Sequence, residues 1–165
     1  GEVIEVLERL VRLNKSLLLL ARIENRQFPD ETEVSFAAIA KEVMDEFTDL
    51  AEHRSVALHF EASGDLVRSM DPALARTLVT NLLKNAILHN ERGGSVTVQV
   101  EQDRLTVRNT GDKPLDAARI FTRFHKETTA DGGTGLGLAI AKAIAELYEL
   151  KLEYRSDAGH CFMLS

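Results

Sequence analysis

The sequence Gly-Gly-Thr-Gly-Leu-Gly-Leu-Ala-Ile-Ala-Lys-Ala-Ile-Ala at residues 132–145 carries the strongest structural signal in this chain. Four glycines within six residues allow the backbone to approach another molecule closely. The alanine, isoleucine and leucine residues behind them favour a helix, so the loop should present unpaired N–H groups at a helix N-terminus. Such an end attracts anions, phosphate above all. A flexible hinge between two elements is the alternative interpretation.

The composition is typical of one globular domain with a short appendage. The chain has 165 residues, of which 44% are hydrophobic and 28% charged. Its 26 acidic residues outnumber the 20 lysines and arginines, and the net charge of -6 argues against nucleic acid as the main partner. The single Cys161 cannot form a disulfide within the chain, and its place in a terminal strand favours a core position over a nucleophile.

No signal peptide or membrane span is visible, because the longest apolar run, residues 17–21, is far too short to cross a bilayer. The chain enters a helical pattern directly after Gly1 and stops just after residues 162–164. We therefore expect a piece of a longer protein that is not itself membrane-bound.

The first 25 residues carry two adjacent apolar stripes at helical spacing. One stripe comprises Val3, Val6, Leu10, Leu13, Leu17 and Leu20, and the other Ile4, Leu7, Val11, Leu18 and Ala21. A helix that is apolar on two faces must pack in a coiled coil or a helical bundle. Membrane-surface binding is the alternative, but the polar face mixes acidic and basic residues, so we favour a dimerisation helix.

Beyond residue 30, the pattern predicts an α+β fold of two layers, with about three helices on one mainly antiparallel sheet. A linker at 27–30 precedes the expected elements, which are a helix from Ser35 to Leu50, a hairpin of strands 56–60 and 66–70, a helix from Asp71 to about His89, paired strands 95–100 and 104–108, a long loop at 110–134, a helix to about Leu147, and strands 152–155 and 160–164.

Two carboxamides stand in register on the helix that starts at Asp71. Asn81, Asn85 and His89 are spaced four residues apart and so share one face. Asparagine oxygens are hard donors suited to Mg²⁺, which takes few protein ligands besides water and phosphate. A pair of surface asparagines is the structural alternative.

Two further segments could complete a site. Asn109-Thr110-Gly111 ends a strand and could read the edge of a base, although an ordinary turn explains it equally well. Ile120-Phe121-Thr122-Arg123-Phe124-His125-Lys126 combines aromatic and basic side chains that could pack a lid and reach phosphates. The alternative for this segment is a loop that Phe121 and Phe124 anchor in the core.

Taken together and in this order, the motifs at residues 81–86, 109–111, 120–124 and 133–140 resemble the N box, first glycine box, F box and second glycine box of sensor histidine kinases. The resemblance covers residues 34–165 and implies a two-layer α/β sandwich of the Bergerat ATP-binding type, which gyrase, mismatch-repair and heat-shock chaperone ATPases share. Residues 1–29 are similar to the second helix of the dimerisation and phosphotransfer bundle with its linker, and residues 30–165 to the catalytic ATP-binding domain.

The resemblance implies ATP and Mg²⁺ as cofactors and a role for each matching residue. Asn85 would coordinate Mg²⁺, Asn81 would lie beside the phosphates, and Lys126, less surely Arg123, would reach the terminal phosphate. The implied catalytic residues are Asn81, Asn85 and Lys126. The implied cofactor-binding residues are Asn81, Asn85, His89, Asn90, Asn109, Gly111, Phe121, Arg123, Phe124, Lys126, Gly133, Thr134, Gly135, Leu136, Gly137 and Leu138.

Three positions depart from the family pattern. Asn109 stands where the family usually has an Asp that accepts the adenine amino proton, and only the oxygen of its amide suits that amine. Leu88 replaces a basic residue that often helps to hold phosphate, and Lys113 replaces the second glycine of the first glycine box.

The resemblance further implies phosphoryl transfer from ATP to a histidine, for two-component signal transduction through a response regulator receiver domain. The histidines are His53, His59, His89, His125 and His160, and none lies on the N-terminal helix, so the chain should bind ATP without phosphorylating itself at the family's site. We expect a homodimer through the helical bundle in the full-length protein, a cytoplasmic location and a parent protein anchored in the bacterial inner membrane.

Three other interpretations compete with this one. A degenerate, non-catalytic nucleotide-sensing or scaffolding module would suit the three departures. An anti-sigma-factor serine kinase shares the Asn and Gly motifs but lacks the bundle helix and the element from Phe121 to Phe124. A Rossmann dehydrogenase fails because the glycines do not follow a strand at Gly-x-Gly-x-x-Gly spacing.

Overall fold

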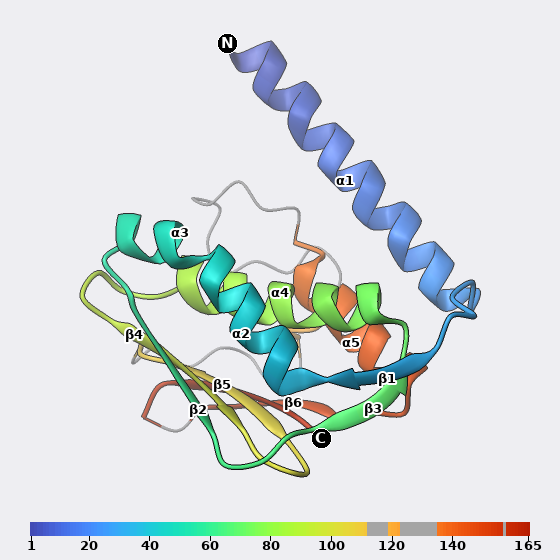
Figure 1. Cartoon of the computed structure of the whole chain (residues 1–165). Coiled ribbons are helices and arrows are strands. Elements are labelled where there is room, and N and C mark those ends of the chain that lie inside the picture. The colour runs from blue at the N-terminus through green and yellow to red at the C-terminus, as the bar shows by residue number, and fades with distance from the viewer. Residues whose placement is uncertain (112–118, 123–134, 157) are drawn as a thin grey trace.

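The computed structural model describes residues 1–111, 119–122, 135–156 and 158–165, and within them the expected two-layer α+β fold is confirmed (Figure 1). The main sheet has five strands in the order β2-β4-β5-β7-β6. Their bounds are β2 Ala57–Ala62, β4 Ser95–Val100, β5 Leu105–Asn109, β7 His160–Leu164 and β6 Leu152–Ser156. All neighbours are antiparallel except β2 and β4, which run parallel.

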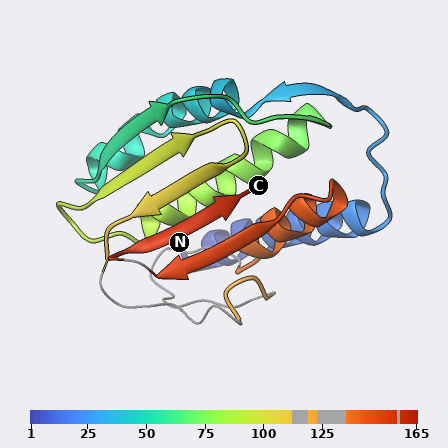
Figure 2. The ribbon, with the colours of Figure 1, turned by 90° about the horizontal axis from the view of Figure 1, so that it is seen from below.

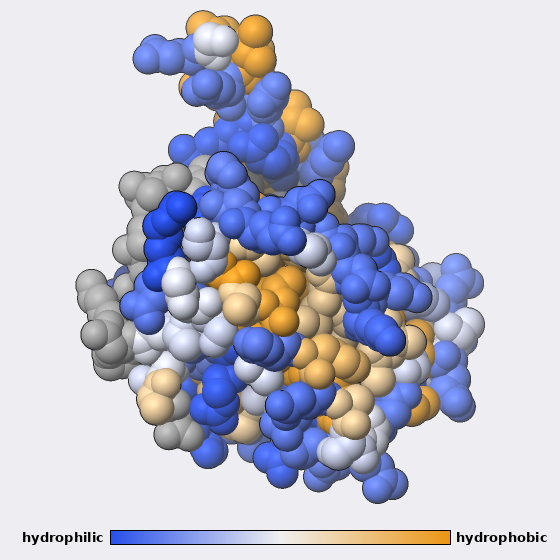
Figure 3. All heavy atoms as spheres, turned by 60° about the vertical axis from the view of Figure 1, so that its left-hand side comes forward, coloured by the Kyte–Doolittle hydropathy of each residue, from blue (hydrophilic) through white to orange (hydrophobic). Residues whose placement is uncertain are grey.

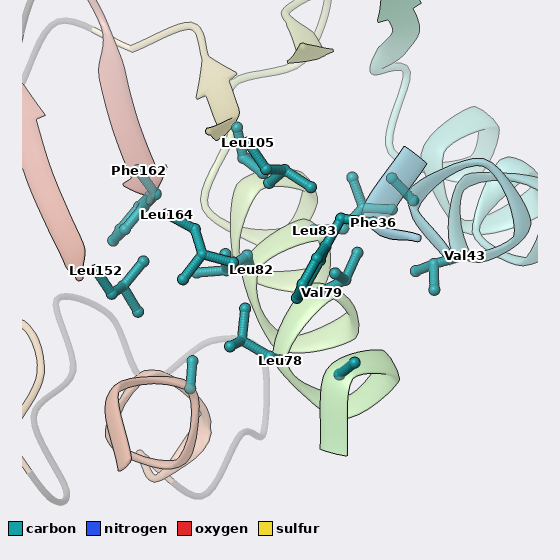
Figure 4. Close-up of a cluster of buried hydrophobic side chains, with 14 of the residues drawn as sticks. Phe36, Val43, Leu78, Val79, Leu82, Leu83, Leu105, Leu152, Phe162 and Leu164 are labelled. Atoms are coloured by element: carbon teal, nitrogen blue, oxygen red, sulfur yellow. The ribbon is translucent and has the colours of Figure 1, made fainter. Parts of the chain in front are cut away.

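One face of this sheet is covered by helices, and Figure 2 shows the opposite face uncovered. The helices are α2 Phe36–Glu46, α3 Thr48–His53, α4 Pro72–Leu88 and α5 Gly137–Leu147. The central helix α4 sends Leu82 toward Leu164 and Leu152 of the sheet, and Leu83 toward Phe36 of α2 (Figure 4). All five side chains are at most 1% exposed, and each contributes about 1.5–3 kcal/mol on burial.

Local signals in the sequence predicted the start of α4 and the pairing of β4 with β5 correctly. Asp71 caps α4, because its Oδ1 accepts hydrogen bonds from the N–H groups of Ala73 (2.9 Å) and Leu74 (3.1 Å), and Pro72 opens the first turn. Strands β4 and β5 form the expected antiparallel pair, with Val98 opposite Val107.

The expected hairpin between residues 56–60 and 66–70 is wrong. Strand β3 (Val67–Met70) pairs instead with β1 (Thr32–Ser35), a strand that the sequence did not predict, in a separate two-stranded sheet. Asp65 holds this arrangement, since its carboxylate accepts bonds from Ser35 Oγ (2.5 Å) and Ala37 N (3.0 Å). Strand β2 pairs with β4 instead.

The helix expected from Ser35 to Leu50 is interrupted at Phe47. Ser35 does cap it, accepting a bond from Ala38 N at 3.1 Å. At Phe47 the N–H donates to both Val43 O and Met44 O, and the Thr48 hydroxyl also donates to Met44 O (3.2 Å). These competing bonds tighten the turn, so that α2 ends and the short α3 begins.

Helix α1 (Glu2–Glu24) stands out from the rest of the molecule (Figure 1). Near its C-terminus, the buried Leu20 and Ile23 belong to the common core, where α1 contacts α5. Its N-terminal part leaves large apolar side chains in water, from 73% exposed at Val3 to 57% at Leu18, and Figure 3 shows them along the projecting helix. Among the described residues, no helix combines the length and apolar character that a bilayer crossing requires.

Candidate functional site

A direct hydrogen bond joins the asparagine-bearing helix to the helix behind the glycines. Asn81 Nδ2 on α4 donates to the carbonyl oxygen of Gly137, the first residue of α5, at 3.0 Å. A Cβ atom at Gly137 would lie 3.9 Å from Asn81 Cγ, so the amide packs closely against the start of α5. This bond fixes Asn81 at the N-terminus of α5.

Asn85 lies one helical turn beyond Asn81, on the same face of α4. It is half-buried, whereas the neighbouring Lys84 is exposed and Ala86 is buried in the core. His89 is the C-cap of α4, and its N–H donates to Asn85 O. The predicted shared face of Asn81, Asn85 and His89 is thus present, and all three side chains are partly accessible.

Helix α5 begins without a side-chain cap. Leu136 occupies the N-cap position and is completely buried, so it anchors the start of the helix by apolar packing. Its carbonyl accepts a bond from Ile140 N at 2.8 Å. The first N–H groups of an α-helix have no partner within that helix, so this end offers donors with a positive partial charge beside Asn81.

Asn109 ends strand β5 and is only 3% exposed. Its Nδ2 donates to the carbonyl oxygen of Thr110 at 3.0 Å, which uses one of the two N–H donors of the amide. The amide therefore offers Oδ1 as its acceptor. An exocyclic amine of a base donates hydrogen bonds, so it requires an acceptor such as Oδ1.

Gly111 lies two residues beyond Asn109 and approaches His160 of β7 closely. Its φ of +141° is rarely adopted by residues with a side chain, and a Cβ there would lie 2.9 Å from His160 Nε2. His160 stands opposite Asn109 in the sheet, and its Nδ1 lies 2.7 Å from the Tyr154 hydroxyl. The end of β5 is thereby supported from β7.

Phe121 is anchored in the core, which was the alternative interpretation of its segment. Its ring meets Phe162 edge to face, with centroids 6.0 Å apart. The Lys142 ammonium lies 5.3 Å from the Phe121 centroid and donates to Leu152 O at 2.9 Å. The sequence pattern predicts no role for Lys142, because a lysine within an alanine-rich helical segment is usually exposed to solvent.

The structure thus brings α4 and the start of α5 together through Asn81, and it supports the end of β5 from its sheet neighbours. Asn90 turns its amide into the fold, donating to Ser95 O at 2.9 Å. Gly135, Leu136, Gly137 and Leu138 stand at the start of α5. The predicted residues Arg123, Phe124, Lys126, Gly133 and Thr134 lie outside the described residues, as does Lys113.

The described residues hold no group of three or more His, Cys, Asp or Glu side chains that could bind a metal ion. The donor that they do offer is the carboxamide oxygen of Asn85, which is hard and partly accessible. Such a donor fits a magnesium ion that completes its shell with water and phosphate oxygens.

Comparison with known families gives one match across residues 70–165, to the model described as histidine kinase-, DNA gyrase B-, and HSP90-like ATPase. The match begins at the cap of α4 and includes β5, α5 and the terminal strands. It therefore contains every element of the site described above.

Two relatives are similar over almost the whole chain. The heme sensor protein HssS of Staphylococcus saprophyticus is 30% identical over 99% of this chain, and the sensor histidine kinase CusS of Escherichia coli O6:H1 is 32% identical over 93%. The chain spans only 37% and 34% of their lengths. Neither a serine kinase nor a non-catalytic module is favoured by these matches.

Solved structures show the same fold. The nucleotide-free catalytic domain of the histidine kinase ThkA is 26% identical with a TM-score of 0.72, covering 82% of this chain and 93% of that one. ThkA in complex with the response regulator protein TrrA is 22% identical with a TM-score of 0.74, covering 96% of this chain and 47% of that one.

Proposed function

Since this chain belongs to the family of histidine kinase-, DNA gyrase B-, and HSP90-like ATPases and is homologous to the catalytic domains of sensor histidine kinases, we propose that it binds ATP between α4, the start of α5 and the end of β5. The hydrogen bond from Asn81 to Gly137 O carries this proposal, because it joins the asparagine-bearing helix to the uncapped helix N-terminus. The phosphates would lie at that N-terminus.

The end of β5 would recognise the base. Asn109 Oδ1 accepts a hydrogen bond from the adenine amino group, while Nδ2 stays bound to Thr110 O. Gly111 would let the backbone at the end of β5 approach the base closely. Guanine carries an oxygen at the equivalent position, so two acceptors would face each other and ATP would be preferred to GTP.

Asn85 is the residue that would hold Mg²⁺, together with water and phosphate oxygens. When bound, the ion neutralises phosphate charge during phosphoryl transfer. Asn81 stays hydrogen-bonded to Gly137 O and keeps the start of α5 beside the phosphates. Lys126, with Arg123 beside it in the sequence, would supply positive charge at the terminal phosphate. Catalysis by these residues would rest on positioning and charge neutralisation.

The phosphoryl acceptor would be a histidine on a helix outside these 165 residues. Residues 1–29 would form the second helix of the dimerisation and phosphotransfer bundle with its linker, and residues 30–165 the catalytic domain. The exposed apolar stripes of α1 support this division, because they can be buried only against other helices.

We place the full-length protein in a two-component system, as a homodimer that passes its phosphoryl group to a response regulator receiver domain. The similarity to ThkA, whose complex with the response regulator TrrA is known, supports this partner. We further propose a cytoplasmic location for this domain and an anchor in the bacterial inner membrane for its parent protein.

Calorimetric titration with Mg·ATP tests the proposal. We expect Asn85→Ala to weaken binding by at least about 100-fold and to remove its dependence on Mg²⁺, because even indirect supports of metal ligands cost 10–100-fold when lost. Lys84→Ala, next to it on the exposed face of α4, is the matched control and should bind normally. Full-strength, Mg²⁺-dependent binding by Asn85→Ala would overturn the assignment.

A further inference from the structure

Asn90, which the family resemblance implied as a cofactor-binding residue, forms a closed hydrogen-bonded group with Thr110, which we call the Asn90–Thr110 cluster. Asn90 Oδ1 accepts bonds from Thr110 Oγ1 (2.7 Å) and from Glu91 N (2.8 Å), while Asn90 Nδ2 donates to Ser95 O (2.9 Å). Thr110 Oγ1 in turn accepts from Ser95 N at 3.0 Å, and Thr110 N donates to Ser95 O at 3.1 Å.

The backbone is shaped to bring these two side chains together. A Cβ atom at Gly94 would overlap both Asn90 Oδ1 and Thr110 Oγ1, and it would lie 3.0 Å from Glu91 O. Only glycine fits there without displacing the cluster. The cluster is therefore a tightly packed feature of the fold rather than a chance surface contact.

The cluster lies between the two halves of the proposed ATP site. Asn90 follows the end of α4, which carries Asn85, and Thr110 directly follows Asn109 at the end of β5. Both lone pairs of Asn90 Oδ1 and one of its two N–H donors are used within the fold, so the amide points away from a role as a nucleotide ligand.

We propose that Asn90 and Thr110 are positioning residues that fix the distance between the phosphate half of the site on α4 and the base half at the end of β5. The inference rests on the proposed function. A ligand that spans both halves gains from their fixed separation, because no binding energy is lost in aligning them. A ligand that touches one half gains nothing from it.

Three ligands separate this role from a merely structural one. Mg·ADP spans both halves, adenosine occupies the base half, and Mg·pyrophosphate occupies the phosphate half. Thr110→Val removes the hydroxyl at constant shape, and we expect it to weaken Mg·ADP roughly tenfold while adenosine and Mg·pyrophosphate change less than about twofold. Thr110→Ser restores the hydroxyl and should restore Mg·ADP affinity.

Asn90→Leu gives an independent test, because it removes the hydrogen bonds of the amide to Ser95 O and Thr110 Oγ1 without adding a charge. It should show the same selective loss of affinity for Mg·ADP, and it provides the test if Thr110→Val fails to fold. Unchanged Mg·ADP affinity in the variants, or equal weakening of all three ligands, would overturn the positioning role while leaving the proposed function in place. Failure of the unaltered chain to bind Mg·ADP would overturn the proposed function itself.

Discussion

Helices α4 and α5 lie side by side on the same sheet, yet their N-termini are built in opposite ways (Figure 1). Helix α4 begins at a carboxylate, and Asp71 binds two of its first N–H groups. Helix α5 begins at the buried Leu136, which has no polar side chain to offer. A side chain caps the first turn of α4, and no side chain caps the first turn of α5.

Under the proposed function, the missing cap of α5 is a functional feature. A side-chain cap is worth about 0.5–2 kcal/mol, so α5 forgoes stability that α4 retains. Apolar burial of Leu136 and the bond from Asn81 to Gly137 O hold the start of α5 in place instead. The proposed function assigns the donors of this first turn to the phosphates of the nucleotide.

Among changes at the two helix starts, the largest expected effect comes from giving α5 a negative charge of its own. Leu138→Glu places a carboxylate in the first turn, where it favours the helix but repels phosphates. Leu138→Gln is the matched control without the charge. We expect the Glu variant to bind Mg·ATP roughly tenfold more weakly than the Gln variant at low salt, by calorimetry, with a smaller difference at high salt.

Equal affinities of the two Leu138 variants at low salt would contradict an anion site at this helix end. The unfolding midpoints of both variants, measured without nucleotide, show whether the loss arises from the charge or from damaged packing.

A smaller effect is expected at the start of α4. Asp71→Ala should lower the free energy of unfolding by about 1 kcal/mol, because two N–H groups of the first turn lose their acceptor. Asp71→Ser retains a capping oxygen and should lose much less. Urea denaturation measures both. In folded protein, the Mg·ATP affinity of both variants should stay within about twofold, because this end of α4 contributes only to stability. A larger loss of Mg·ATP affinity would contradict the difference that we infer between the two helix starts.

The smallest effect concerns Tyr148, the C-cap of α5, whose hydroxyl accepts a bond from Asp71 N at 3.2 Å. Burial raises the pKa of the Tyr148 phenol above its usual value of 10.0, and the nearby charges of Asp71 and Glu31 act in the same direction, while the bond from the Asp71 N–H opposes them. The folded state therefore keeps its proton longer than the unfolded state.

A raised pKa gives a stabilising contribution that is complete below about pH 10 and is lost as the pH rises through the folded-state value. Tyr148→Phe should cost about 1 kcal/mol at pH 7 through the lost hydrogen bond, and its stability should fall less steeply above pH 10. Urea denaturation at pH 7, 9 and 10.5 measures this, and parallel pH profiles of the two proteins would rule the contribution out.

The sequence was most informative where the deciding interactions are local. Asp71-Pro72 predicted the start of α4, and the four-residue spacing alone predicted that Asn81, Asn85 and His89 share one face of that helix. The pairing of β4 with β5 was predicted because a short turn connects strands of matching alternation.

The errors concern interactions between distant segments. Residues 66–70 were assigned to the nearest strand, but Asp65 binds Ser35, thirty residues earlier, and draws β3 to β1. The hydrogen bond between Asn90 and Thr110 was also not predicted, because the two residues lie twenty positions apart along the chain. The spacing of residues along a sequence predicts which side chains share a face of one helix or strand. It does not predict which other helix or strand will pack against that face.

The close approach of Gly111 to His160 also has an evolutionary consequence. Any side chain at position 111 would meet the imidazole at 2.9 Å and would also strain the backbone, whose φ is +141°. Because that φ disfavours other residues even where there is space, glycine should persist at position 111 along a lineage of this domain whichever residue stands at position 160. Its persistence would record in ancestral sequences a backbone conformation adopted only in the folded chain.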